Sequence, residues 1–293
     1  MDNPTEGNIL EVQNLCKKFK DFTLKNISFD LPRGYVMGFI GPNGAGKSTT
    51  IKLIMNLMRR SSGQVKVFGL DNIVYEREVK DRIGFVYDEN HYYEEWTIRD
   101  MARIVASFYS RWEEKTFERY LKEFGLNSGQ KIKELSKGMK LKFALAAALS
   151  HQAELLIMDE PTGGLDPVVR SELLEILARL IQDEHKSVFF STHITSDLDK
   201  IADYITFINE GEIVLSAPKD DILEQFAVVK GGKELLNGES RKLFVGLKTN
   251  SFGFEGLVRD REQAGKWFKD SILVEKPTLD DIMLYTVRGE QSV

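Results

Sequence analysis

The amino-acid sequence predicts an α/β fold built around a mostly parallel sheet. Three short runs, residues 35–40, 155–158 and 187–191, have the largely apolar character of strands that are buried on both faces. Glycine or polar residues follow each run, and helical patterns follow the first two. The chain has 293 residues, of which 42% are hydrophobic, so it can bury a substantial core, and its length favours about two domains.

Composition and charge exclude several classes of protein. The apolar runs stop after a few residues, whereas a membrane-spanning helix needs about 20, and no charged-then-apolar leader opens the chain. The single cysteine, Cys16, cannot form an internal disulfide, which is typical of a reducing cytosol. A net charge of -5 argues against a broad surface for nucleic acid. We therefore expect a soluble, cytoplasmic globular protein that binds no nucleic acid.

Alternating side chains mark the amino-terminal region. Residues 8–31 alternate between apolar and polar types, as at Leu10 and Glu11. This period of two predicts edge strands of a small antiparallel subdomain. The parallel core begins at Tyr35, so residues 1–88 are expected to hold the N-terminal β subdomain and the first part of the core.

The most informative motif covers residues 41–49. Two glycines five positions apart precede a lysine and a serine, which is the P-loop pattern that binds nucleotide phosphates. The motif follows the strand at 35–40 and precedes a helical pattern with Ile51, Ile54 and Met58 on one face. Backbone amides and the positive end of that helix favour a bound phosphate. An ordinary glycine-rich turn would not need this strand, loop and helix, so we expect a nucleoside triphosphate with magnesium.

Individual roles follow from the P-loop pattern. Lys47 is expected to reach the β- and γ-phosphates, and Ser48 is expected to bind magnesium. The residues of the motif expected to contact the nucleotide are Asn43, Gly44, Ala45, Gly46, Lys47, Ser48 and Thr49.

The segment after the first core strands is helical in pattern. Charge-rich helical faces occupy the stretch up to Ser150, which predicts an inserted α-helical subdomain over residues 89–150. Ser136 is placed to cap the helix that contains Phe143, and that helix end is a second site for an anion.

Two carboxylates, Asp159 and Glu160, follow the apolar run at 155–158. They fall at the carboxyl end of a strand, which is the edge where open α/β sheets bind ligands. Asp159 is therefore expected to hold magnesium, and Glu160 is expected to act as general base toward water. Solvated turn residues are the alternative, which is much weaker beside a P-loop.

The second part of the core is predicted over residues 151–219. Asp166 and Pro167 are typical of a helix N-cap and first helical position. His193 follows the run at 187–191 and is either a hydrogen-bonded structural histidine or a contact to the γ-phosphate. Its place at the phosphate edge of the sheet favours the contact.

The remaining residues, 220–293, predict a separate small C-terminal α+β accessory domain. Short strands such as 243–245 and a last helix after Pro277 support this prediction. The pattern does not decide whether this domain regulates the protein, contacts a partner or only stabilises the fold.

Together these motifs resemble the nucleotide-binding subunit of ATP-binding-cassette (ABC) transporters over about residues 8–217. The resemblance implies a P-loop NTPase core of the RecA-like type that binds and hydrolyses ATP with Mg2+. The family's Walker A, signature, Walker B and D-loop motifs fall on residues 41–49, 135–139, 155–160 and 164–166, and its switch histidine falls on His193. Its adenine-stacking aromatic residue falls on Phe19, with Phe22 as the fallback.

The resemblance also implies a dimer that shares its ATP sites. Two such subunits, identical or related, pair head to tail, so that Ser136, Gly138 and Asp166 of one meet the ATP held by the P-loop of the other. Two departures from the family pattern concern this arrangement. Asp88 stands where most members have a glutamine, and either Asp88 or Glu89 would take over its role toward the metal. Lys137 and Met139 replace the usual signature residues, whereas Ser136 and Gly138 remain, so we expect the closed state to form.

The function implied is that of an ATP-hydrolysing motor subunit that powers a separate membrane permease from the inner face of the membrane. The Ser-Lys-Gly-Met variant and the C-terminal extension resemble the exporter branch of bacitracin-type, other antimicrobial-peptide and phenol-soluble-modulin exporters. Tyr92, Tyr93 and Trp96 either receive a cytoplasmic helix of the permease or pack internally. A soluble ABC ATPase acting on ribosomes or DNA and a nucleotide-gated regulator are the alternatives. The single P-loop and the lack of a long heptad insert disfavour the first.

Overall fold

A computed structural model of the chain describes residues 7–87, 92–268 and 271–292. Asp88 and Glu89, the two candidates for the metal role at the expected glutamine position, lie outside the described residues.

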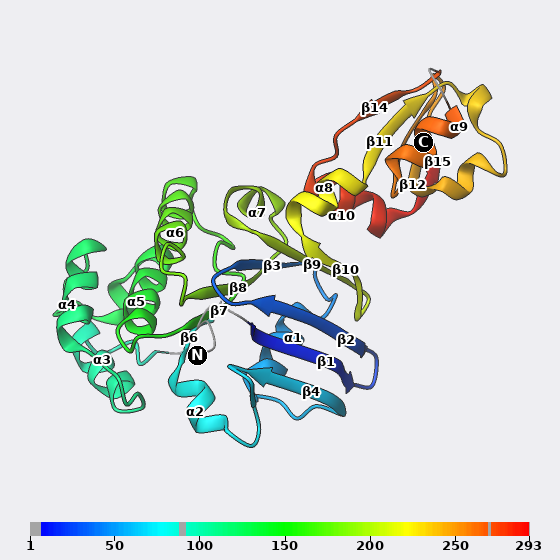
Figure 1. The fold of residues 1–293 in the computed structure, drawn as a ribbon. Coiled ribbons are helices and arrows are strands. Elements are labelled where there is room, and N and C mark those ends of the chain that lie inside the picture. Colours follow the sequence, from blue (N-terminus) through cyan, green and yellow to red (C-terminus); the bar gives the residue numbers. More distant parts are fainter. Residues whose placement is uncertain (1–6, 88–91, 269–270, 293) are drawn as a thin grey trace.

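Among the described residues, the central sheet has six strands, of which the five from β9 to β6 are parallel, and β10 pairs antiparallel at one edge. In spatial order the strands are β10 (Glu212–Pro218), β9 (Tyr204–Asn209), β3 (Val36–Ile40), β8 (Ser187–Thr192), β7 (Leu155–Asp159) and β6 (Ile83–Val86). The three apolar runs of the sequence form β3, β7 and β8, side by side in the middle of this sheet (Figure 1). The expected α/β class is confirmed.

A second, antiparallel sheet packs against one face of the central sheet (Figure 1). Its strands, in spatial order, are β2 (Thr23–Pro32), β1 (Asn8–Lys18), β4 (Ser62–Val67) and β5 (Leu70–Asp71). The two sheets share a buried apolar cluster in which the ring of Phe29 stacks on Phe189 of β8, with centroids 5.6 Å apart. The predicted N-terminal β subdomain is therefore present.

Helix α1 (Lys47–Ile54) starts inside the P-loop and packs into the same cluster. The sequence pattern continued to Met58, but the helix ends at Ile54 and Asn56 adopts a left-handed φ of 50°. This conformation stops the helix because it turns the chain away from helical dihedrals. Met58 still packs against the cluster from beyond the helix end, so its apolar character reports burial rather than helix.

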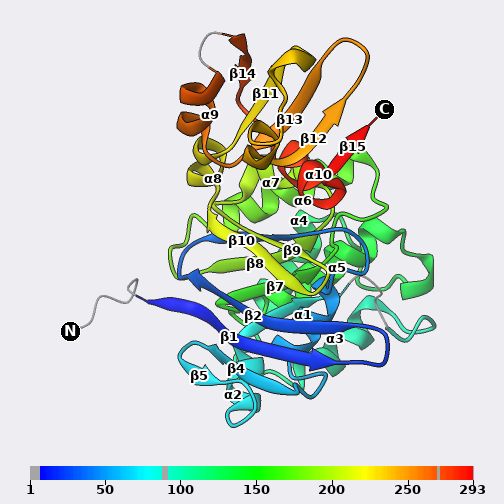
Figure 2. The same ribbon diagram turned by 90° about the vertical axis from the view of Figure 1, so that its right-hand side faces the viewer.

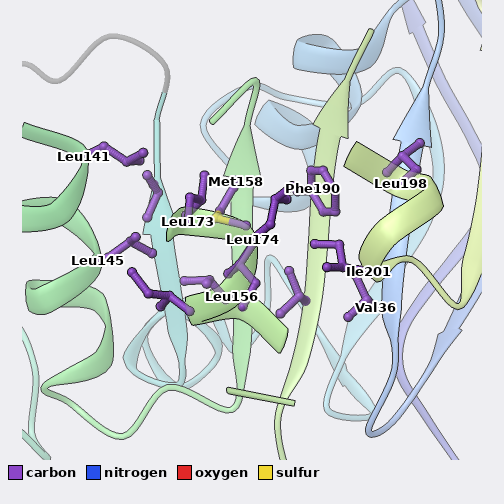
Figure 3. Packing of buried hydrophobic residues seen from close by; sticks show 14 of the residues in the cluster. Val36, Leu141, Leu145, Leu156, Met158, Leu173, Leu174, Phe190, Leu198 and Ile201 are labelled. Atoms are coloured by element: carbon purple, nitrogen blue, oxygen red, sulfur yellow. The ribbon is translucent and has the colours of Figure 1, made fainter. Parts of the chain in front are cut away.

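Helices cover the opposite face of the central sheet. Because side chains alternate along a strand, Leu156 and Met158 of β7 point to this face, where they meet α5 (Lys137–Leu149) and α6 (Pro167–Leu180), as Figure 3 shows. α7 (Thr195–Ile201) adds Leu198 to the same cluster. The other helices of this part of the chain are α2 (Glu76–Asp81), α3 (Ile98–Ala106), α4 (Glu114–Glu123) and η1 (Ile132–Glu134). Of these, α3, α4 and η1 form with α5 the predicted helical subdomain.

The C-terminal part is an α+β unit, as predicted. It lies on a different side of the core from the helical subdomain (Figures 1 and 2). Its sheet contains, in spatial order, β14 (Leu273–Glu275), β11 (Ala227–Gly231), β13 (Phe254–Val258), β12 (Phe244–Thr249) and β15 (Glu290–Ser292). Its helices are α8 (Lys219–Gln225), η2 (Lys233–Leu235), η3 (Ser240–Leu243), α9 (Arg261–Phe268) and α10 (Leu279–Arg288).

Helix α10 attaches this unit to the core. Ile282 and Tyr285 on α10 belong to the same buried cluster as Leu198 on α7. Thr195 Oγ1, at the start of α7, also lies 3.4 Å from Asp280 Oδ1. In the described parts of the chain, no helix combines the length and apolar character that a transmembrane span requires.

Candidate active site

The P-loop lines a hollow of about 420 Å³ at the carboxyl end of β3. Gly44 and Gly46 adopt φ values of 81° and 115°, which favour glycine. A Cβ atom at Gly46 would lie 2.9 Å from Leu24 Cδ1, so only glycine lets the loop pack this closely on β2. The lining residues are Phe22, Asn43, Gly44, Gly46, Lys47, Ser48, Thr49, Lys137, Glu160, Gly163 and His193. The sequence motif and the hollow therefore coincide.

Lys47 is the buried cation of this hollow. Its side chain is only 5% exposed, and Nζ donates to Gly41 O at 2.7 Å and Pro42 O at 3.2 Å. Nζ also forms an ion pair with Glu160 Oε1 at 3.1 Å. The lysine thus joins the loop after β3 to the end of β7.

Asp159 ends β7 and accepts two hydroxyl hydrogen bonds on one oxygen. Ser48 Oγ donates to Asp159 Oδ1 at 3.1 Å, and Ser191 Oγ donates to the same atom at 2.6 Å. Ser191 belongs to β8, where it pairs directly with Asp159 across the parallel ladder. The serine and the aspartate predicted for the metal are therefore adjacent.

Glu160 lies between Lys47 and His193. Its Oε2 contacts His193 Nδ1 at 2.8 Å, and the backbone N–H of His193 donates to the same oxygen at 3.3 Å. Because a carboxylate only accepts hydrogen bonds, Nδ1 carries the proton in this arrangement. Glu160 also has a φ of 48°, an uncommon value for a residue with a Cβ atom. Glu160 therefore directly contacts both other residues predicted for catalysis, Lys47 and His193.

Ser136 and Gly138 of the signature and Asp166 of the D-loop do not line this hollow in the single chain. Ser136 caps α5, its Oγ accepting the N–H of Met139 at 3.2 Å, and Asp166 Oδ1 caps α6 through the N–H of Val168 at 3.0 Å. A Cβ atom at Gly138 would lie 2.8 Å from Val169 Cγ1, so this glycine allows α5 to pack on α6. Both predicted N-caps are confirmed.

Of the other residues predicted to contact the nucleotide, some line the hollow and others do not. Phe22, the fallback residue, lines the hollow, whereas Phe19 is 42% exposed and tilts against Phe22 with ring centroids 6.2 Å apart. This geometry favours Phe22 over Phe19 as the aromatic residue beside a nucleotide. Ala45 is buried and does not line the hollow, and its carbonyl accepts the N–H of Gly211 at 3.0 Å.

Lys137 and Gly163 line the hollow and Ser191 lies behind it, and none of the three was assigned to the site from the sequence. Lys137 reaches the hollow from the start of α5, although its signature neighbours Ser136 and Gly138 do not. Ser191 contacts Asp159 and Glu160, and the only sequence signal for it was its place at the end of an apolar run.

Comparisons with known proteins agree with this geometry. The profile of the ABC transporter family matches residues 24–163. The bacitracin transport ATP-binding protein BcrA of Bacillus licheniformis is 31% identical over 217 residues, which cover 73% of this chain and 71% of BcrA. The lantibiotic transport ATP-binding protein SrtF of Streptococcus pyogenes is 35% identical over 215 residues, which cover 72% of this chain and 92% of SrtF.

A solved structure of the ATP-binding subunit of an ABC transporter superposes with a TM-score of 0.67 at 30% identity, covering 74% of this chain and 92% of that one. Sequence motifs, the geometry of the hollow and these matches agree, and the chain belongs to the ABC transporter family as an ATP-binding ATPase subunit.

Proposed function

We propose that this chain is the motor subunit of an exporter for peptides of the antimicrobial, amphiphilic type and works with a separate membrane permease. The observation that carries the proposal is the contact among Lys47, Glu160 and His193 in a chain similar to BcrA and SrtF. Those two proteins are named for transport of bacitracin and of a lantibiotic. Their names favour transport over action on ribosomes or DNA and over regulation without transport.

The site supports a division of roles in ATP hydrolysis. Lys47 Nζ, held by two loop carbonyls, is placed to exchange these contacts for β- and γ-phosphate oxygens. Glu160 is placed to orient and deprotonate the attacking water, because Lys47 and His193 fix its two oxygens. His193 and Lys47 then offset the charge that develops on the transferred phosphoryl group.

The donor set at the end of β7 fits Mg2+. Ser48 and Asp159 offer a hydroxyl and a carboxylate 3.1 Å apart, which are oxygen ligands of the kind that this ion prefers. Mg2+ is commonly held by one or two carboxylates together with substrate phosphates. The described residues contain no group of three or more His, Cys, Asp or Glu side chains that could hold a metal ion. When bound, Mg2+ would neutralise phosphate charge. Asp88 keeps its proposed role toward this ion.

Each ATP is proposed to lie between two subunits, identical or related. In one chain, Ser136, Gly138 and Asp166 do not line the P-loop hollow, which supports their use on the ATP of a partner. Phosphate release would then reopen the dimer. The subunit is proposed to act in the cytoplasm and to reach the inner face of the membrane through its permease.

The decisive experiment is purification of the tagged chain from detergent-solubilised membranes, followed by reconstitution with the integral membrane protein that accompanies it. We expect this protein to raise ATPase activity in proteoliposomes, with a further rise on addition of a cationic amphiphilic peptide. ATPase activity that responds to ribosomes or DNA but not to any membrane protein would contradict the proposal.

A further inference from the structure

Ser191 is a fully buried serine that lies beside Asp159 and Glu160, the two acidic residues at the end of β7. It lies near the carboxyl end of β8 and has no exposed surface. A buried hydroxyl is costly unless it is hydrogen-bonded, so the partners of Ser191 show what it does.

Its single hydroxyl contacts both carboxylate residues. Ser191 Oγ donates to Asp159 Oδ1 at 2.6 Å and accepts the backbone N–H of Glu160 at 3.0 Å. We propose that Ser191 is a positioning residue for ATP hydrolysis. It fixes Asp159, the proposed metal ligand, and Glu160, the proposed general base, relative to each other. This inference rests on the roles proposed above for Asp159 and Glu160.

The contact to Glu160 supports an uncommon backbone conformation. Glu160 has a left-handed φ of 48°, which a residue with a Cβ atom adopts only when its surroundings hold it there. Its N–H is shared between Ser191 Oγ at 3.0 Å and Ser191 O at 3.2 Å, and its carbonyl accepts the N–H of Gly163 at 3.1 Å. Removing Oγ leaves the longer of the two N–H contacts, so the carboxylate loses part of the support that aims it at Lys47 and His193.

The contact with Asp159 orients the carboxylate that is proposed to bind Mg2+. Asp159 Oδ1 also accepts from Ser48, but Ser48 is itself proposed to bind Mg2+. Ser191 has no exposed surface, and its hydroxyl is already engaged by Asp159 Oδ1 and by the backbone N–H of Glu160. Its hydroxyl therefore acts on catalysis only through the two carboxylates. Partners of this kind commonly change activity or metal affinity about 10- to 100-fold when removed.

Strand β8 supplies a matched control. Ser187 begins the same strand, is equally buried, and its Oγ accepts the N–H of Gly34 at 2.8 Å. Ser187→Ala removes the same atom from the same strand at the end away from the hollow. A purely structural role for Ser191 predicts that Ser191→Ala and Ser187→Ala behave alike.

The experiment measures ATPase kinetics and binding of a fluorescent ATP analogue, with and without Mg2+, for the isolated full chain. For Ser191→Ala we expect kcat to fall at least about 10-fold, with KM changed less than about threefold, because the P-loop still holds the triphosphate. The gain in ATP affinity on adding Mg2+ should also shrink several-fold, which reports on Asp159 without turnover. Ser187→Ala should stay within about twofold of wild type in both measurements, even if its melting temperature falls equally.

Two further variants make the test independent of any folding defect. Ser191→Thr keeps the hydroxyl and should recover most of the kcat, and Ser191→Cys, nearly isosteric but a weak donor, should fall between wild type and Ser191→Ala. Wild-type kcat and Mg2+ response in Ser191→Cys, or identical behaviour of Ser191→Ala and Ser187→Ala, would overturn the proposal. These assays need no permease, so a failure of the proposed exporter function leaves the result readable.

Discussion

Lys47 Nζ and Glu160 Oε1 lie 3.1 Å apart, so the P-loop lysine holds the residue proposed as general base. Both side chains are largely buried, with 5% and 16% of their surfaces exposed. The other oxygen of Glu160 contacts His193, which places the base between two hydrogen-bond donors. Three separate segments of the chain meet at this carboxylate: the start of α1, the end of β7 and the residue that follows β8.

Glu160→Gln tests this arrangement. The amide keeps the shape of the side chain but cannot take a proton from water, so we expect ATP turnover to fall by about two to three orders of magnitude. ATP affinity should be retained or rise, because Lys47 loses a competing carboxylate. Gel filtration with ATP should then show a stable dimer, and phosphate release measures the loss of turnover. Glu212→Gln, at an exposed ion pair with Lys25, is the control. Normal phosphate release by Glu160→Gln would remove Glu160 as the base.

Local rules made much of the site predictable. The N-caps at Ser136 and Asp166 were foreseen because a capping side chain and its helix are adjacent in sequence. The same holds for the P-loop and for Asp159 and Glu160, since each strand delivers the residues that directly follow it.

Long-range packing decided what sequence patterns could not. Phe19 and Phe22 are both aromatic and close in sequence, and only the path of the turn between β1 and β2 brings Phe22 to the hollow. Ser191 gained its contacts through its parallel pairing with β7, which no local pattern encodes. Likewise, Tyr92 packs edge-on against Phe143, with ring centroids 4.9 Å apart, whereas its neighbour Tyr93 is 62% exposed.

The exposed pair of Tyr93 and Trp96 is the better candidate for contact with a permease. Their rings stack 4.9 Å apart, and 39% of Trp96 is exposed. Trp96→Ala should weaken permease binding about tenfold or more, since aromatic residues often dominate interfaces, while leaving the isolated subunit folded. Trp267→Ala removes a comparably exposed tryptophan from α9 and serves as control. Equal permease binding by both variants in a pull-down would refute a docking role for Trp96.

Glu154 should make the fold sensitive to strong acid. It precedes β7 and forms ion pairs with Arg82 at 2.8 Å, Arg33 at 3.3 Å and Arg111 at 3.4 Å. Burial alone would raise the pKa of Glu154, but the hydrogen bonds and charges of Arg82 and Arg33 outweigh it and lower the pKa from 4.5 to about 2. Because the folded pKa is the lower one, this stabilisation is complete above pH 4.5 and is lost as the pH falls toward 2.

Each pKa unit is worth about 1.4 kcal/mol, and because Glu154 is partly exposed to screening solvent, we expect it to contribute roughly 1–2 kcal/mol. Urea unfolding at pH 7 and pH 3 measures it. Glu154→Gln should lower the free energy of unfolding at pH 7 by about 1–3 kcal/mol, because three arginines lose their carboxylate. In the same variant, the free energy of unfolding should depend less on pH below 4.5. If Glu154→Gln loses as much free energy of unfolding between pH 7 and pH 3 as the wild type, the acid sensitivity comes from other carboxylates.

His151 should act in a higher pH range. It is fully buried, its ring stacks on Tyr109 with centroids 3.7 Å apart, and neither ring nitrogen has a hydrogen-bond partner among the described residues. Burial lowers the pKa of His151 from 6.5 to about 4, so the folded protein keeps this ring neutral. Protonation therefore favours the unfolded chain, and stability should decline by roughly 2–3 kcal/mol as the pH falls from 6.5 toward 4.

His151→Phe isolates this effect, because phenylalanine keeps a stacked ring but cannot be protonated. We expect this variant to lose the decline in melting temperature between pH 7 and pH 5, and to match or exceed wild type at pH 5, since it no longer buries two unpaired nitrogens. His185→Phe is the control, because His185 lies on the surface after α6. Should His151→Phe and wild type lose stability equally over this range, the neutral buried histidine is not the source of the acid sensitivity.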